Sequence, residues 1–338
     1  MLPRWIITAA FLLSSLWSFG QTATTLYGAG STFVYPIMAK WAVEYHKIHP
    51  EIQISYLPQG SAAGIAQAIT GLLDFGATDA PLTDSQIATA NVKLIHFPVI
   101  LGADVPAYNL PEVQTQLRFT GPVLADVFLG KIKNWNDRAI AAVNPGIRFP
   151  NRPIVVVHRQ DGSGTTYIWT DYLSKVSPEW KNKVGKGTSV KWPVGIEANG
   201  NEGVSEAIRN TQGAFGYIEL SYAEKKKIAF GSVQNSDGAF ISASVSSIEE
   251  AANSLKQIPS DFRVSIANAA GTNAYPIASF SWVLVPTRPK HASDKKVLMD
   301  FLSWAISDGQ RFAEDLFYSP LPQELTARIN AVMVAQLR

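Results

Sequence analysis

Residues 156–166 have the sequence VVHRQDGSGTT, and this stretch decides how the chain is interpreted. The β-branched run at its start is typical of a buried strand, and the apolar-periodic residues 167–176 behind it are typical of a helix. The small residues between them form a tight turn, which leaves backbone N–H groups, hydroxyls and the guanidinium of Arg159 at a helix N-terminus. Such a terminus carries roughly half a positive charge and attracts anions. The stretch therefore predicts an oxyanion site.

The same order of strand, small hydroxyl-bearing turn and helix occurs twice more, at residues 30–33 and 60–61. A serine or threonine ahead of a helix is most often only an N-cap. Three such ends that met at one point would, however, aim their N–H and O–H donors at a single anion. Arg159 would add a full positive charge, and Asp161 could hold its fork in place. The alternative for Arg159 is a surface ion pair with Asp161.

Asp79 follows a further short strand, expected at 74–78, and a carboxylate belongs in an anion site only if the ligand donates a proton to it. Monohydrogen phosphate carries such a proton at neutral pH, and sulfate does not. A buried acceptor that faces a second acceptor loses a hydrogen bond and gains repulsion. Asp79 would therefore discriminate against fully ionised oxyanions. The alternative is that Asp79 caps a helix running from Pro81.

The order of elements is α/β in character. Strands are predicted at residues 25–27, 52–57, 74–78, 93–101, 154–158, 215–218 and 277–285, and helices at 34–47, 65–70, 123–129, 167–176, 297–305 and 323–334. Two lobes suit this order, with the chain crossing between them near residue 100 and again near residue 275. We expect lobe 1 to comprise residues 21–102 and 276–338, and lobe 2 to comprise residues 103–275.

Residues 1–20 are typical of a secretory signal peptide, with a short basic start, an uncharged apolar stretch and small residues ahead of a cleavage before Gln21. We therefore expect an exported protein. The formal net charge of the 338 residues is +2 and only 17% of them are charged. The chain therefore has no strong electrostatic field that would attract nucleic acid or a membrane surface. The absence of cysteine excludes disulfides and thiolate metal sites.

An enzyme is the main alternative class, but the residues that its chemistry needs are missing. A serine hydrolase would have Gly-x-Ser-x-Gly, and Asp161 stands where the first glycine belongs ahead of Ser163. The five histidines form neither a base pattern nor a metal pattern. We therefore expect no catalytic residue, no metal and no cofactor. A phosphomonoester hydrolase and a binding protein for another tetrahedral oxyanion, such as sulfate, molybdate or tungstate, are the alternatives.

Taken together, the motifs resemble those of the PstS-type periplasmic phosphate-binding proteins of phosphate ABC transporters. The similarity covers essentially the whole mature chain, and the segments that carry it, in the order of the family, are residues 28–33, 74–82, 129–137, 159–165, 190–195 and 213–218. The resemblance implies a two-lobed periplasmic-binding-protein fold, type II-like, with lobes hinged around a ligand cleft. It also implies a periplasmic monomer that binds inorganic phosphate and membrane permease subunits.

The resemblance further implies a role for individual residues. Asp79 would accept the proton of the ligand, Arg159 would be the cation, and Asp161 would tether that arginine. The remaining phosphate contacts would come from three loops, through Thr32, Phe33, Ser61, Ser163, Gly164 and Thr165. One departure lies in the second loop, where Ala62 and Ala63 stand in place of the serine and glycine that the family often has.

Overall fold

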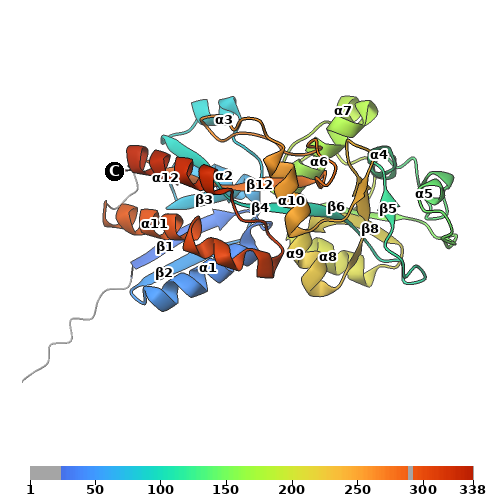
Figure 1. The fold of residues 1–338 in the computed structure, drawn as a ribbon, viewed down its shortest axis with the longest axis horizontal. Helices are drawn as coiled ribbons and strands as arrows, with labels where there is room; N and C mark the ends of the chain where they lie inside the picture. The colour runs from blue at the N-terminus through green and yellow to red at the C-terminus, as the bar shows by residue number, and fades with distance from the viewer. Residues whose placement is uncertain (1–23, 288–291, 338) are drawn as a thin grey trace, which may run out of the picture.

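One mixed sheet runs through the whole molecule and joins its two halves (Figure 1). The computed structural model describes residues 24–287 and 292–337, so the predicted signal peptide, residues 1–20, lies outside the described residues. The strand order is β2-β1-β3-β12-β4-β8-β6-β7, with β9 paired to β4, and a small second sheet has the order β11-β10-β5. No helix within the described residues is long and apolar enough to cross a membrane.

The strands of the described residues are β1 (Thr24–Gly30), β2 (Ile52–Leu57), β3 (Phe75–Thr78), β4 (Leu94–Tyr108), β5 (Arg118–Phe119), β6 (Val155–Arg159), β7 (Ile196–Ala198), β8 (Ala214–Glu219), β9 (Ala229–Phe230), β10 (Ser232–Gln234), β11 (Phe240–Ile241) and β12 (Ala278–Pro286). The helices are α1 (Tyr35–Ile48), α2 (Ser61–Thr70), α3 (Asp84–Ala88), α4 (Gly121–Phe128), α5 (Arg138–Ala142), α6 (Gly164–Val176), α7 (Pro178–Lys183), α8 (Gly200–Asn210), α9 (Leu220–Lys226), α10 (Val245–Asn253), α11 (Ala292–Ala305) and α12 (Gln323–Leu337). Two short 3₁₀ helices, η1 and η2, occupy Asp308–Phe312 and Glu314–Leu316.

The long strand β4 is the connection between the halves. Its residues 94–103 pair antiparallel with β12, and its residues 104–108 pair antiparallel with β8. We call the part with β1, β2, β3 and β12 the first half, and the part with β6, β7 and β8 the second half. The strand predicted at 93–101 is therefore too short. Its continuation contains Gly102, Asp104 and Pro106, residue types that are depleted in strands, but here they are held in a fully buried ladder.

Each half contains a point where the direction of strand addition reverses. In the first half, β1 lies between its parallel neighbours β2 and β3. In the second half, β6 lies between its parallel neighbours β7 and β8. Right-handed crossovers then place successive helices on opposite faces of the sheet, and they leave a crevice at the carboxyl ends of the strands. Both crevices receive the loops that the sequence singles out.

Two helices beside these crevices begin earlier than predicted. The helix predicted at 65–70 begins at Ser61, and the one predicted at 167–176 begins at Gly164. Their first turns contain small residues without apolar periodicity, so the pattern could not reveal them. Gly60 precedes α2 with φ +92°, a backbone conformation that favours glycine, and a Cβ there would lie 2.5 Å from Oδ2 of Asp161.

Large aromatic side chains fill the core of a chain that has no disulfide to stabilise it. Trp41, Trp135 and Trp282 are almost fully buried. Each donates its indole N–H to a backbone carbonyl, of Gly309, Gly213 and Phe262 respectively, at 2.8–2.9 Å. The indole N–H of each of these three tryptophans therefore has a hydrogen-bond acceptor although the side chain is buried.

Candidate anion-binding site

The loops at the two crevices meet across the halves. The N–H of Ala62 at the start of α2 donates to the carbonyl of Gly162 at 3.0 Å. Gly164, the first residue of α6, lies so close to the first half that a Cβ there would be 2.2 Å from Oδ2 of Asp79 and 2.4 Å from Oγ of Ser61. The N-termini of α2 and α6 therefore converge on one place. Ala62, the departure from the family pattern, lies at this contact.

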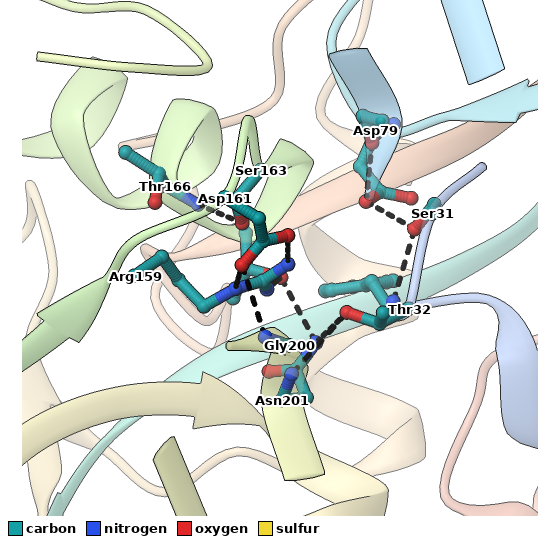
Figure 2. A network of polar contacts seen from close by, with 12 residues as sticks. Ser31, Thr32, Asp79, Arg159, Asp161, Ser163, Thr166, Gly200 and Asn201 are labelled. Atoms are coloured by element: carbon teal, nitrogen blue, oxygen red, sulfur yellow. Dashed lines mark hydrogen bonds and ion pairs between the residues drawn. The ribbon is translucent and has the colours of Figure 1, made fainter. Parts of the chain in front are cut away.

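Asp79 is completely buried and is held by serine hydroxyls (Figure 2). Ser31 donates to its Oδ2 and Ser281 to its Oδ1, both at 2.5 Å, and Ser61 donates to Oδ2 at 3.3 Å. Burial raises the pKa of Asp79 to about 6, although these hydrogen bonds limit the rise. No helix runs from residue 81, because α3 begins at Asp84 and is capped by Thr83. The helix-cap alternative for Asp79 is therefore wrong.

Arg159 and Asp161 form the opposite, charged side of the site (Figure 2). Nε of Arg159 donates to Oδ1 of Asp161 at 2.7 Å, Nη2 forms an ion pair with Oδ2, and Nη1 donates to Oγ1 of Thr165 at 3.2 Å. Burial acts to raise the pKa of Asp161, but the hydrogen bonds and charge of Arg159 outweigh it and hold that pKa below its usual value. Arg159 is only 4% exposed, so the surface ion-pair alternative is wrong.

Asn201 links the two sides and was missed by the sequence reasoning. Its Nδ2 donates to Oγ1 of Thr32 at 3.1 Å and to Oγ1 of Thr165 at 3.0 Å, so one amide joins the first and third loops (Figure 2). Its Oδ1 accepts the N–H of Glu219 at 3.0 Å. Asn201 lies in the first turn of α8, directly after β7. The turn Asn199–Gly200–Asn201 behind a strand is the only sequence signal that could have indicated it.

The serines of the loops are also used within the protein. Ser31 Oγ accepts the N–H groups of Phe33 and Val34 at 2.9 and 3.3 Å, which turns the first loop inward. Ser163 is the N-cap of α6 and accepts the N–H of Thr166 at 3.0 Å. The expected capping role therefore holds for Ser163, and its hydroxyl proton remains available to a ligand.

The contacts above bring the predicted site residues together around the meeting point of the two halves. The set comprises Thr32, Phe33, Ser61, Asp79, Arg159, Asp161, Ser163, Gly164 and Thr165. Their contacts with a ligand stay a prediction. Within the described residues, no group of three or more histidine, aspartate or glutamate side chains is placed to hold a metal ion.

Comparison with known proteins places this fold and these loops in a family. Residues 19–309 match the family model described as a PBP superfamily domain. The phosphate-binding protein PstS of Xylella fastidiosa (strain Temecula1 / ATCC 700964) is 42% identical over 313 residues, which cover 92% of this chain and 85% of that protein. The phosphate-binding protein PstS of Pasteurella multocida (strain Pm70) is 42% identical over 322 residues, which cover 95% and 93%. This chain belongs to the PstS phosphate-binding protein family.

A solved structure shows the same fold at low sequence identity. It is a putative phosphate ABC transporter substrate-binding protein from Clostridium perfringens, 18% identical, with a TM-score of 0.66, and the match covers 88% of this chain and all of that one. The predicted α/β periplasmic-binding-protein fold and the resemblance to PstS are thereby confirmed. The PstS relatives are binding proteins, so the prediction that this chain is not an enzyme is confirmed as well.

Proposed function

We propose that this PstS family member binds inorganic phosphate between its two halves and delivers it to the permease of a phosphate ABC transporter. The observation that carries the proposal is the contrast between Asp79 and Arg159. The anion site has one buried cation, which would hold an oxyanion, and one buried carboxylate, which would repel it unless the ligand brings a proton. Monohydrogen phosphate meets both demands, and sulfate meets only the first.

The proposed contacts follow from where each group lies. Arg159, tethered by Asp161, would contact two phosphate oxygens, because its fork is fixed in the plane of the ion pair. Asp79 would accept the phosphate proton. The hydroxyl and N–H donors would come from the three loops, through Thr32, Phe33, Ser61, Ser163, Gly164 and Thr165. For Phe33 and Ser61, the bonds to Ser31 and Asp79 would be exchanged for, or shared with, bonds to the ligand.

We further infer a hinged arrangement of two lobes, with residues 21–102 and 276–338 as lobe 1 and residues 103–275 as lobe 2. This division is supported by β4, which changes its partner from β12 to β8 between Ala103 and Asp104. A ligand held from both sides would favour the closed state by its differential affinity. The residues that face each other across the halves, Ala62 and Gly162 among them, would separate on opening.

We infer export to the periplasm, where a monomer would pass phosphate to the membrane permease subunits. The signal-peptide pattern of residues 1–20 supports the export. The relatives named PstS support the partnership with a phosphate transporter.

Calorimetric titration of the purified protein with phosphate and with sulfate, at pH 7 and 8, tests the proposal. We expect saturable phosphate binding at a ratio of one to one and far weaker sulfate binding. Small-angle scattering should give a smaller radius of gyration with phosphate than without it. Equal affinity for the two anions would contradict the role of Asp79. Steady release of phosphate from phosphomonoesters, lost in Ser163→Ala, would favour the hydrolase alternative instead.

A further inference from the structure

Two further buried carboxyl groups lie at the connection between the halves. Asp104 of β4 and Glu219 of β8 are direct partners in the antiparallel ladder. Side chains of directly opposed residues lie on the same face of a sheet, with Cβ atoms about 4.5–5.5 Å apart. Both residues are completely buried. Neither residue belongs to a motif that stands out in the sequence.

Three of the four carboxyl oxygens of this pair have no hydrogen-bond partner among the described residues. They are both oxygens of Asp104 and Oε1 of Glu219. The fourth, Oε2 of Glu219, accepts the N–H of Ser221 at 3.0 Å and also the Ser221 hydroxyl, because Glu219 is the N-cap of α9. An unpartnered buried carboxylate is costly, whereas a neutral carboxylic acid is much less so.

The surroundings decide which of the two carboxyls holds a proton. Two carboxylates that face each other in a buried place cannot both ionise without strong repulsion. Glu219 receives hydrogen bonds at a helix N-terminus, which favour its charged form, and Asp104 receives none. Burial raises the pKa of Glu219 to about 8, and it raises that of Asp104 well above the usual value, with Asp79 and Glu219 adding to the rise. Asp104, which lacks these hydrogen bonds, is therefore the carboxyl of the pair that holds its proton more tightly.

The pair is connected to the anion site on the same face of the sheet. Gly102 lies two residues before Asp104 on β4 and so shares its face, and a Cβ at Gly102 would touch the ring of Phe33 at 2.5 Å. The backbone N–H of Glu219 donates to Asn201, the residue that bridges Thr32 and Thr165. The charges of Asp79 and Arg159 both act on Asp104.

We propose that Asp104 keeps its proton at neutral pH, which keeps a second negative charge away from the bound dianion. With Asp104 neutral, Asp79 is the only one of these two aspartates that is ionised, and the phosphate proton can donate its hydrogen bond to it. With Asp104 ionised, an additional negative charge would act on the anion within a buried, weakly screened environment. The inference rests on the proposed function, since it concerns the same site.

None of the titratable groups around Asp104 supplies a hydrogen bond that would favour its ionised form. The charged groups that act on it are Asp79 after β3, Glu219 on β8 and Arg159 on β6. Tyr275, whose hydroxyl donates to the Asp104 carbonyl at 2.9 Å, and Tyr217 both have a pKa raised by burial, so they stay neutral. Arg159 is already paired with Asp161 and is not hydrogen-bonded to Asp104.

Infrared difference spectroscopy at pH 7, comparing the phosphate-bound and free protein, tests the inference. A protonated carboxyl gives a C=O stretching band that a carboxylate lacks. We expect such a band to shift on phosphate binding, to move when aspartate is labelled with carbon-13, and to be absent in Asp104→Asn. It should persist in Glu219→Gln, the matched control across the ladder. The isotope label assigns the band to an aspartate, and in the free protein at pH 8 Asp79 is ionised because its pKa is about 6. An aspartate band that remains at pH 8 therefore belongs to Asp104, so the test survives if a variant fails to fold.

Phosphate titration of the same proteins gives a second readout. Asn is neutral and matches the size of Asp, so Asp104→Asn should bind phosphate within about threefold of the parent at pH 7. A tenfold or greater change in affinity would overturn the proposal, because a large gain would mean that Asp104 is charged in the parent. A missing Asp104 band, or one that phosphate leaves unchanged, would overturn it too. If the parent did not bind phosphate, the proposed function would fail, while the band would still report the proton on Asp104.

Discussion

Asp79 and Asp161 are both aspartates of the anion site, the first fully buried and the second half-buried, and their surroundings shift their pKa values in opposite directions. Asp79, in the first half, is surrounded by hydroxyls, and its pKa is raised to about 6. Asp161, in the second half, is paired with Arg159, and its pKa is lowered. A hydroxyl compensates only part of the cost of burying a charge, whereas a guanidinium compensates more than all of it. The two aspartates therefore have different tasks in the proposed site. Asp79 accepts a hydrogen bond only from a ligand that carries a proton, and Asp161 keeps the cation Arg159 in place.

The largest effect is expected from Arg159→Ala, which removes the cation and leaves Asp161 without its partner. Removing one member of a buried charged contact typically costs about 2–5 kcal/mol of binding. Phosphate affinity should therefore fall by a factor on the order of 30 or more. Arg159→Lys is the matched control, because it keeps the charge and loses the fork. Its phosphate affinity should lie between that of the parent and that of the alanine variant. Calorimetry that shows unchanged affinity in Arg159→Ala would contradict the role of this residue.

Asp79→Asn tests the other side of the comparison through selectivity. Asparagine keeps the size of the side chain and replaces an acceptor by a group that can also donate. The repulsion toward sulfate should fall, while phosphate loses a charge-assisted hydrogen bond. The ratio of phosphate to sulfate affinity should therefore drop in competition binding, by about tenfold or more. A ratio equal to that of the parent would show that discrimination resides elsewhere in the cleft.

The same substitution has a consequence for stability in the free protein. Because the pKa of Asp79 is raised from 3.8 to about 6, the folded state holds this proton more tightly than the unfolded state does. The stabilising contribution is complete below pH 4 and is lost as the pH rises through 6. A difference of about two pKa units corresponds to about 3 kcal/mol. Asp79→Asn should thus unfold at a higher denaturant concentration than the parent at pH 7, and the advantage should vanish at pH 4.

A smaller loss is expected from Asp161→Asn, because the cation itself remains. The new amide would keep one acceptor for Arg159 or for the N–H of Gly200, which Oδ1 of Asp161 accepts at 2.9 Å. Weakening one hydrogen bond to a charged group costs about 1.5–3 kcal/mol. Phosphate affinity should fall less than in Arg159→Ala, and selectivity against sulfate should stay as in the parent. A changed selectivity would mean that the two aspartates do not have separate tasks.

The comparison also shows what the sequence can and cannot predict. The loops around Ser61 and Arg159 were predictable because strand, small turn and helix are adjacent in the chain. Ser281 and Asn201 were not, because a serine in the middle of a strand and an asparagine behind a three-residue strand carry no local signal. Their roles depend on which strands become neighbours, and in particular on the pairing of β12 with β3 and β4. The first turns of α2 and α6 were hidden by the lack of apolar residues.

The smallest expected effect comes from Ser281→Ala, which removes one of the donors to Asp79 and leaves Ser31 and Ser61 in place. The bond from Ser281 lowers the pKa of Asp79, so its loss should raise that pKa further. The proposed acceptor must be ionised, and a higher pKa means a smaller ionised fraction near pH 6. Phosphate affinity should therefore fall more at pH 6 than at pH 8.

The matched control is Ser279→Ala, two residues earlier on the same strand, because Ser279 donates to the carbonyl of Phe280 and not to Asp79. The loss in Ser281→Ala should be on the order of 1 kcal/mol, the net contribution of a single hydrogen bond. Phosphate titrations of both variants at pH 6 and at pH 8 measure these losses. Equal losses in the two variants, or a loss in Ser281→Ala that does not depend on pH, would mean that Ser281 acts only as packing and that the ionisation of Asp79 is set by Ser31 and Ser61.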